Sequence, residues 1–430
     1  MQTLSTKDAD FDRNFKRVVS ARRESDSDLA LTVRDILRAV RGNGDGALVK
    51  YTQRFDSYAL VEDDDWTVSR ERCAEAYRSI EPDLRDALDL AAARIRAYHE
   101  AQLPENRDYT DDDGVRLGAI WQPVEAAGLY VPGGRAAYPS SLLMNAIPAR
   151  VAGVDRLVVV TPTQKGHSND LVLAAAHVAG VDEIWRVGGA QAIGALAYGT
   201  DRIAPVDVIT GPGNAYVAEA KRQVFGVVGI DMVAGPSEIL VVADAKNKPE
   251  WIATDLLSQA EHDPSAQSIL ITDDEAFVAM VMDAIDLQLM NLDTAKVARQ
   301  SWEDNGVVIL VDDLGAEAPD LINRLAAEHV ELAIEQPEEM LSEIRHAGSV
   351  FLGRMTPEAV GDYVAGPNHV LPTGRRARFS SGLSVLDFMK RTSFISLDEN
   401  SFRTIGPAAA KLARAEGLPA HALSVEMRLK

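Results

Sequence analysis

Short runs of Val, Ile and Leu alternate with longer alanine-rich segments over most of the chain after Gly128. The apolar runs have the length of strands, and the intervening segments space their apolar residues as one face of a helix does. This alternation is typical of βαβ units, and it occurs in two successive blocks, so the sequence predicts an α/β protein with two parallel sheets. The expected strands are Leu157–Val160, Glu183–Val187, Val206–Ile209, Ile239–Ala243, Ser268–Ile271, Val307–Val311 and Leu332–Ile334.

The residues before Gly128 predict helices rather than a sheet. Positions 29, 33, 36, 37 and 40 are apolar with a helical period, and a second helix is expected after Pro82. Residues 1–24 are polar and charged, which indicates a small N-terminal arm. After Ser384 the alternation of strands and helices gives way to a short helical tail.

Composition narrows the possible functions. The 430 residues are 46% hydrophobic, and 65 acidic against 44 basic side chains give a formal net charge of −21, which disfavours binding to nucleic acid or anionic lipid. The N-terminus lacks the pattern of a secretory signal, and no stretch has the length of a membrane span. Cys73 is the single cysteine and reads as an inert thiol. A cytoplasmic enzyme or binding protein with a small-molecule ligand is therefore expected.

The segment Gly361–Arg375 reads GDYVAGPNHVLPTGR and combines glycine and proline turn residues with Asp362 and His369. Its turn residues are incompatible with one continuous helix or strand. Asp362 and His369 are therefore expected on a stiff, exposed binding loop.

Two polar pairs have the spacing of a functional site. Gln259 and His262 lie three residues apart near the end of an expected helix, Pro249–Glu261, so one face presents both side chains and can chelate a metal. Glu328 and His329 are expected to end a later helix and, as neighbours there, to point in different directions and serve two protons. Each pair also has a purely structural interpretation as an ordinary helix end.

Three glycine-containing loops follow expected strands. They are Tyr130–Arg135, the turn at Gly188 that opens a helix containing Gln191, and Gly211–Asn214. Glycine turns at helix N-termini expose amide donors to a phosphate, and loops that follow parallel strands share the carboxyl edge of the sheet. Each loop alone is also an ordinary turn, but as a set they predict a ligand site.

Together these segments resemble the histidinol dehydrogenase family. The resemblance covers nearly the whole chain, and its motifs occur in the family's order. The motifs that carry it are GLYVPGGRAAYPSSLLMNAIPA, VGGAQAIGALAYGT, GPGN, DMVAGPSEILVVAD, LLSQAEHDPSAQ, NRLAAEHVELAIEQP, GDYVAGPNHVLPTGRRARFSSGLSV and EGLPAHALSV.

The resemblance implies oxidation of L-histidinol through L-histidinal to L-histidine with reduction of two NAD+. It implies one Zn2+ per subunit, although ligands without a thiolate also suit manganese or cobalt. By this resemblance Glu328 and His329 are the acid/base pair. The chemistry of the two steps suggests, as a hypothesis, that His329 takes the alcohol proton and that Glu328 activates the water that adds to the aldehyde. The implied metal ligands are Gln259, His262, Asp362 and His421; the substrate contacts are these four with Ser237, His329, His369 and Glu416; and the NAD contacts are Tyr130, Gln191 and Asn214.

The resemblance also implies an architecture of two incomplete Rossmann-like domains, one inserted in the other. Residues 129–236 are the inserted NAD-binding domain, and residues 25–128 and 237–383 carry most metal and catalytic residues. Residues 1–24 and 384–430 are arms, and the second completes the partner subunit's site in a homodimer. Two alternatives remain: a zinc-dependent amidohydrolase that uses Glu328 to activate water, and a metal- or nucleotide-binding regulatory protein without turnover.

Overall fold

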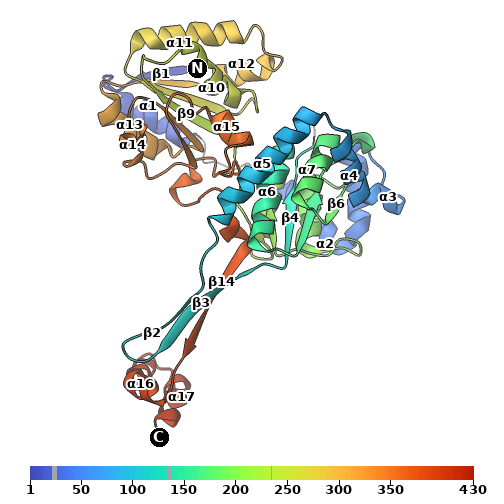
Figure 1. Ribbon diagram of the computed structural model, residues 1–430, viewed down its shortest axis with the longest axis vertical. Helices are drawn as coiled ribbons and strands as arrows, with labels where there is room; N and C mark the ends of the chain where they lie inside the picture. Colours follow the sequence, from blue (N-terminus) through green and yellow to red (C-terminus); the bar gives the residue numbers. More distant parts are fainter. Residues whose placement is uncertain (22–26, 134–137, 234) are drawn as a thin grey trace.

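The computed structural model describes residues 1–21, 27–133, 138–233 and 235–430. Two α/β units lie side by side, and a narrow ribbon extends from them to a small pair of C-terminal helices (Figure 1). Within the described ranges, no helix combines the length and the apolar character needed to cross a bilayer.

The first unit is built on a six-stranded parallel sheet with the order β1-β11-β10-β9-β12-β13. One apolar cluster joins a face of this sheet to α1, α13 and α14, and a second joins the other face to α10, α11 and α12. The strands are β1 (Gln2–Ser5), β9 (Glu238–Ala243), β10 (Gln267–Thr272), β11 (Val307–Leu310), β12 (His329–Ala333) and β13 (Ser349–Leu352). The helices are α1 (Phe11–Ser20), α10 (Pro249–Ala260), α11 (Glu275–Gln288), α12 (Ala295–Asn305), α13 (Leu314–Leu325), α14 (Pro337–Leu341) and α15 (Glu358–Tyr363).

The second unit is built on a five-stranded parallel sheet with the order β6-β5-β4-β7-β8. Helices α4, α5, α6 and α7 cover one face, and α2, α8 and α9 cover the other. The strands are β4 (Ala126–Tyr130), β5 (Arg156–Val160), β6 (Glu183–Trp185), β7 (Val208–Thr210) and β8 (Gly229–Ile230). The helices are α2 (Ser27–Asp56), α3 (Asp63–Trp66), α4 (Arg70–Ser79), α5 (Pro82–Glu100), α6 (Pro139–Ala152), α7 (Asp170–Ala179), α8 (Gly189–Tyr198) and α9 (Ala215–Val224).

The two sheets share one winding. Apart from β1 at the edge of the six-stranded sheet, the first strand of each unit lies near the middle, the next two lie to one side, and the following two lie to the other: β9 then β10 and β11 against β12 and β13, and β4 then β5 and β6 against β7 and β8. This order, 3-2-1-4-5, is that of a doubly wound Rossmann-like sheet without its sixth strand. The predicted α/β class with parallel sheets flanked by helices is therefore confirmed.

The packing of the N-terminal residues differs from the expectation. Leu4, Phe11, Phe15 and Val18 are buried against the six-stranded sheet, so β1 and α1 belong to that unit instead of forming an arm; residues 22–24 lie outside the described part. The sequence predicts that residues 25–128 belong with residues 237–383, in the six-stranded unit. Helices α2, α4 and α5 instead pack on the five-stranded sheet. The reason is that their apolar faces meet α6, α7 and α8. The remaining domain boundaries stay a prediction.

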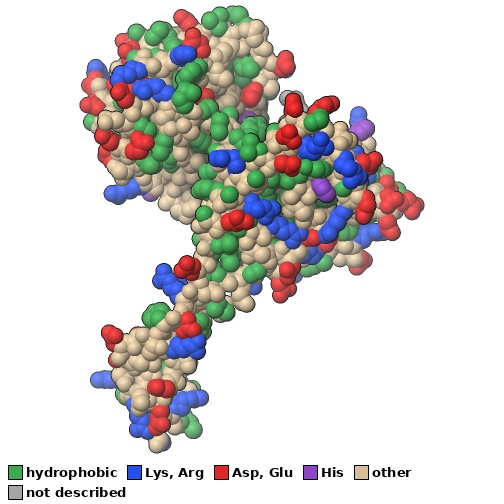
Figure 2. Space-filling model, viewed as in Figure 1, with side chains coloured by type: hydrophobic (Ala, Val, Ile, Leu, Met, Phe, Trp, Pro, Cys, Tyr) green, Lys and Arg blue, Asp and Glu red, His purple; other side chains and the backbone are tan. Residues whose placement is uncertain are grey.

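The C-terminal residues form more than a short helical tail. Strand β14 (Met389–Ser396) pairs antiparallel with β3 (Arg116–Pro123), which also pairs with β2 (Arg107–Thr110). Eight residues of pairing make a ribbon about 27 Å long that ends in α16 (Glu399–Ala415) and α17 (Pro419–Leu429). Acidic and basic side chains are interspersed over both units and this arm (Figure 2).

Candidate active site

Glu328 and His329 lie at the amino edge of the six-stranded sheet, where β12 begins beside β9. The Glu328 Oε2 atom accepts a hydrogen bond of 2.9 Å from the Glu238 backbone N–H, and His329 Nδ1 lies 3.1 Å from the Glu238 carbonyl oxygen. Both side chains are buried, with exposures of 6% and 3%. The backbone of one residue in β9 therefore orients both members of the expected catalytic pair.

The prediction that Glu328 and His329 end a helix is wrong. Helix α13 ends at Leu325, and Ala326 adopts a left-handed conformation with φ 46°. A non-glycine residue in this conformation stops the helix, and the chain turns directly into β12. The polar Glu-His pair hides the start of that strand because buried strands are expected to be apolar.

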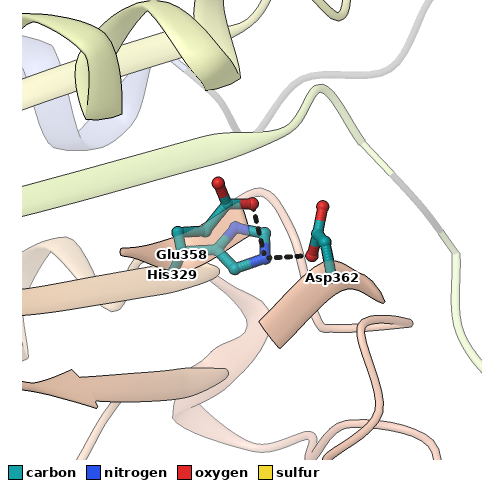
Figure 3. Close-up of side chains that lie close together, drawn as sticks. All are labelled: His329, Glu358 and Asp362. Atoms are coloured by element: carbon teal, nitrogen blue, oxygen red, sulfur yellow. Dashed lines mark ion pairs between the residues drawn. The ribbon is translucent and has the colours of Figure 1, made fainter. Parts of the chain in front are cut away.

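Asp362 lies in a helix. The prediction from the turn residues, which placed it in a loop, is wrong. Asp362 is in the last turn of α15, four residues after Glu358, so both carboxylates face His329 (Figure 3). His329 Nε2 is 3.7 Å from Glu358 Oε1 and 3.7 Å from Asp362 Oδ1. The ligand atoms of these three residues lie within 4.8 Å of one another, which makes them a candidate cation site.

Glu358 is a site residue that sequence reasoning missed. Its exposure is only 2%, and its Oε2 atom lies 3.3 Å from the Ser258 hydroxyl, which donates to it. The available signal was its spacing of four residues from Asp362, which puts two carboxyl groups on one helical face. The expectation of an irregular loop through Gly361 obscured this spacing.

His369 follows in the segment after α15, with its Nδ1 atom 2.9 Å from the Asp362 carbonyl oxygen. This segment is largely buried instead of exposed: Asn368, Val370 and Arg375 have exposures of 7%, 7% and 2%. The Asn368 side chain donates to the Met144 carbonyl oxygen in α6 of the second unit. The segment therefore packs between the units and holds His369 in place.

Gln259 and His262 meet at the end of α10, as their spacing predicts. Gln259 Nε2 and His262 Nδ1 are 3.2 Å apart. Gln259 is fully buried, and within the described residues its Oε1 atom has no hydrogen-bond partner. A buried amide oxygen without a donor is suited to bind a cation. Ser237 precedes β9 at this same amino edge, where its carbonyl oxygen accepts the Gln267 N–H at 3.0 Å.

The electrostatics of the site separate neutral imidazoles from charged ones. Burial lowers the pKa of His369. The His262 side chain reaches solvent, but the protein atoms around its ring remove enough water to lower its pKa as well. Burial also acts to lower the pKa of His329, but the charges of Glu328, Glu358 and Asp362 raise it to about 10. Burial acts to raise the pKa of Asp362, yet the nearby His329 and the charges of His369 and His262 lower it to about 2. Asp362 therefore stays ionised.

Burial raises the pKa of Glu328 to about 8 and that of Glu358 to about 7. Both groups can therefore gain or lose a proton near neutral pH, which suits exchange of protons with a substrate.

The residues expected to contact a dinucleotide gather at the carboxyl edge of the five-stranded sheet. Tyr130 ends β4, Gln191 lies in the first turn of α8, and Asn214 caps α9 after β7. The Tyr130 hydroxyl accepts the Gly189 N–H at 3.1 Å, and the buried Gln191 amide has no hydrogen-bond partner among the described residues. The remainder of the loop after Tyr130, from residue 134, lies outside the described residues.

His421 and Glu416 do not lie with the other predicted site residues of the same chain. Both are exposed, His421 on α17 and Glu416 at the end of α16. These helices lie at the far end of the ribbon, away from both sheets (Figure 1). A single chain therefore brings together Ser237, Gln259, His262, Glu328, His329, Asp362 and His369, and it leaves the two tail residues apart.

Comparisons with known proteins cover the whole chain. A profile of the histidinol dehydrogenase family matches residues 19–429. The chain is 59% identical over 426 residues to histidinol dehydrogenase of Zymomonas mobilis, covering 99% of each. It is 60% identical over 426 residues to histidinol dehydrogenase of Rhodospirillum rubrum, covering 99% of this chain and 98% of the relative. The crystal structure of histidinol dehydrogenase from Elizabethkingia anophelis is similar with a TM-score of 0.94 and 36% identity, covering 100% of this chain and 98% of that one.

Proposed function

The chain belongs to the histidinol dehydrogenase family, and we propose that it oxidises L-histidinol through L-histidinal to L-histidine with reduction of two NAD+. One observation carries the proposal: a titratable pair, Glu328 and His329, is buried beside Asp362 and held by the backbone of β9. The carboxyl and imidazole groups needed to move protons thus lie next to a group suited to bind a cation. A cytoplasmic location remains part of this proposal.

We propose that Gln259, His262 and Asp362 hold Zn2+, with His421 of the partner subunit as a fourth ligand. The fit is supported by the unpartnered amide oxygen of Gln259, the low pKa of His262 and the ionised Asp362. Zinc would supply a Lewis acid that binds the imidazole and amine of histidinol and fixes the substrate. Manganese or cobalt would suit the same oxygen and nitrogen ligands.

The dinucleotide is proposed to bind over the carboxyl edge of the five-stranded sheet, against Tyr130, Gln191 and Asn214. Among the residues that the structure describes, the donor and acceptor of the buried Gln191 amide are unpaired, which fits a polar ligand group. NAD+ would accept the hydride of each oxidation step. The segment after α15 contacts both units: its Val364 carbonyl oxygen accepts from Arg94 of α5, and its Arg375 side chain donates to the Gln267 side-chain oxygen of β10 at 2.7 Å.

The proton steps are assigned to the buried pair. His329 would take the alcohol proton so that hydride leaves from an alkoxide-like carbon, and it would need to be neutral beforehand. Positive charge bound at Asp362 lowers the pKa of His329 and so favours the neutral imidazole. Glu328, whose pKa of about 8 permits exchange near neutral pH, would activate the water that adds to the aldehyde. Ser237 and His369 would contact the substrate.

We further propose a homodimer in which residues 384–430 reach the partner's site. The arm is a long ribbon with exposed apolar side chains, including Ile395, Leu412 and Met427 at 68%, 65% and 64%. Apolar groups exposed together on a projecting arm favour contact with another chain. Exchange would bring Glu416 and His421 of the partner subunit to the site.

The test is the yield of NADH per histidinol, measured together with metal content. Two equivalents of NADH per histidinol and one zinc per subunit are expected for the four-electron oxidation. One equivalent of NADH would reduce the proposal to an ordinary alcohol dehydrogenase. No NADH would exclude it and favour the zinc-dependent amidohydrolase, which reduces no NAD+.

A further inference from the structure

The five-stranded unit contains a fully buried ion pair that the proposed reaction does not use. Lys221 of α9 and Asp231, just after β8, form this pair, with side-chain exposures of 2% and 1%. Removing two charges from water costs several kcal/mol, which the pair recovers only with good geometry and further hydrogen bonds. The further hydrogen bonds of Lys221 and Asp231 therefore show which part of the chain the ion pair holds in place.

Both groups bind the backbone of Gly211. The Gly211 N–H donates to Asp231 Oδ2 at 2.9 Å, and the Gly211 carbonyl oxygen accepts from Lys221 Nζ at 3.0 Å. Asp231 is itself fixed, because its Oδ1 atom accepts the Met232 N–H at 2.6 Å and its own N–H donates to the Ile209 carbonyl oxygen. One peptide residue is thus held from both sides by a buried pair.

Gly211 has little freedom to move. Its φ of 112° lies in the region that favours glycine, and a Cβ at this position would lie 2.2 Å from the Tyr130 carbonyl oxygen. The loop therefore lies directly against the end of β4. Three residues later, Asn214 Oδ1 accepts the Val217 N–H at 3.1 Å and starts α9. The position of Gly211 thus sets the spacing between Tyr130 and Asn214.

We infer that Lys221 and Asp231 are positioning residues for the dinucleotide: by clamping Gly211 they fix loop 211–214 at the separation from β4 that binding requires. The inference rests on the proposed dinucleotide site at Tyr130, Gln191 and Asn214. Neither side chain needs to touch the ligand, because the effect passes through the loop backbone. Loosening the clamp weakens dinucleotide binding and leaves histidinol and metal binding in the other unit unchanged.

The test is a fluorescence titration of the zinc-loaded, full-length enzyme with NADH. The paired replacement Lys221→Met/Asp231→Asn removes the ion pair and the donor to the Gly211 carbonyl oxygen without leaving a lone buried charge. It is expected to raise the Kd for NADH at least about tenfold, with zinc content and the KM for histidinol within about twofold of wild type. Lys221→Gln/Asp231→Asn also leaves no lone buried charge, and it keeps a donor and an acceptor that can still meet the Gly211 backbone. Its Kd for NADH is expected to lie between those of wild type and Lys221→Met/Asp231→Asn, so it serves as the test where that variant does not fold.

Leu88→Ala is the matched control, because it creates a cavity in α5 of the same unit, where Leu88 is 7% exposed and packs in the cluster below α6 and α7. It lowers the melting temperature but is expected to leave the Kd for NADH unchanged. A paired variant with the Kd of this control would show that the ion pair is merely structural and would overturn the inference. A wild-type enzyme that does not bind NADH would overturn both the dinucleotide site and the clamp, and the control would then fail as well.

Discussion

Carboxyl groups crowd around His329. Glu328, Glu358 and Asp362 each place an oxygen within 3.8 Å of one of its ring nitrogens. Neighbouring charge would tune the pKa of His329 as the proposed base, and a bound cation would shift this residue toward the neutral form that accepts a proton. The proposed roles of His329, which takes the alcohol proton, and of Glu328, which activates water, can be tested by replacing each residue alone.

His329→Asn is expected to lower the rates of both oxidation steps by about 10² to 10⁴, because the base is lost. Glu328→Gln is expected to spare the oxidation of histidinol and to slow that of histidinal, so that NADH release stops near one equivalent. Single-turnover kinetics with histidinol and with histidinal separate these effects, and His177→Asn on the exposed face of α7 is the control. Wild-type rates for both steps in His329→Asn would show that the base is another group.

Glu331, two residues further along β12, gives a pH-dependent prediction. It is 2% exposed, and burial together with the charge of Asp255 raises its pKa from 4.5 to about 9. Because the folded chain binds this proton more tightly than the unfolded chain, the group lowers stability progressively as pH rises from about 5 to 9.

Glu331→Gln removes this penalty and keeps a donor toward Asp255. The melting temperature of Glu331→Gln minus that of wild type should therefore be larger at pH 8.5 than at pH 5.5. The two differences should themselves differ by on the order of 3 °C. Differential scanning calorimetry at both pH values checks this, with the exposed Glu343→Gln as control. An equal difference at the two pH values would mean that Glu331 is ionised in the fold.

At the scale of elements, sequence pattern located the strands whose residues are buried on both faces. Val158 and Ile269 lie in runs of Val, Ile and Leu, and β5 and β10 begin and end within one residue of their predicted bounds. The pattern failed where polar chemistry interrupts a strand. Strand β12 begins with His329 and Val330, but its prediction began at Leu332, since the site itself supplies the polar residues that hide the strand.

The ribbon escaped prediction for another reason. Residues of β3 are mostly half-buried or exposed, so no strong alternation marks the strand. Its partner β14 is remote in sequence, pairing Arg391 with Trp121, and such contacts leave no local signal. The spacing of Gln259 and His262, which is local, was in contrast readable and correct.

Replacing Gly348, which lies just before β13, tests whether the position of Glu328 at the start of β12 depends on this neighbouring strand. A Cβ at Gly348 would lie 2.5 Å from the Glu328 carbonyl oxygen and 3.2 Å from Pro372 Cδ, and the backbone atom cannot move without shifting Glu328. Gly348→Ala is expected to lower kcat/KM for histidinol at least about tenfold, because displaced catalytic groups lose their orientation.

Gly42→Ala makes the same chemical change in α2, where nothing lies within 4 Å of the new Cβ. It should leave kcat/KM unchanged and stabilise the unit by about 0.5 to 1 kcal/mol. Steady-state kinetics and thermal melting of both variants make the comparison. Unchanged kinetics in Gly348→Ala would mean that the strand start tolerates displacement.

At the scale of the whole molecule, the two proposed sites lie at opposite kinds of sheet edge. Open parallel sheets bind ligands at their carboxyl edge, and the proposed dinucleotide contacts Tyr130, Gln191 and Asn214 lie at that edge of the five-stranded sheet. Glu328 and His329 instead occupy the amino edge of the six-stranded sheet. Since α17, which carries His421, lies at the end of the arm (Figure 1), the proposed metal site needs a second chain to be complete.

Subunit complementation tests that claim most directly. Co-expression of His329→Ala chains with His421→Ala chains gives mixed dimers with one intact site if the tail serves the partner: one subunit supplies the core, and the other supplies the tail. With random pairing, half of the dimers are mixed, so about one quarter of wild-type NADH production is expected, whereas each variant alone is inactive. Activity no higher than that of the separate variants would contradict a site shared between subunits.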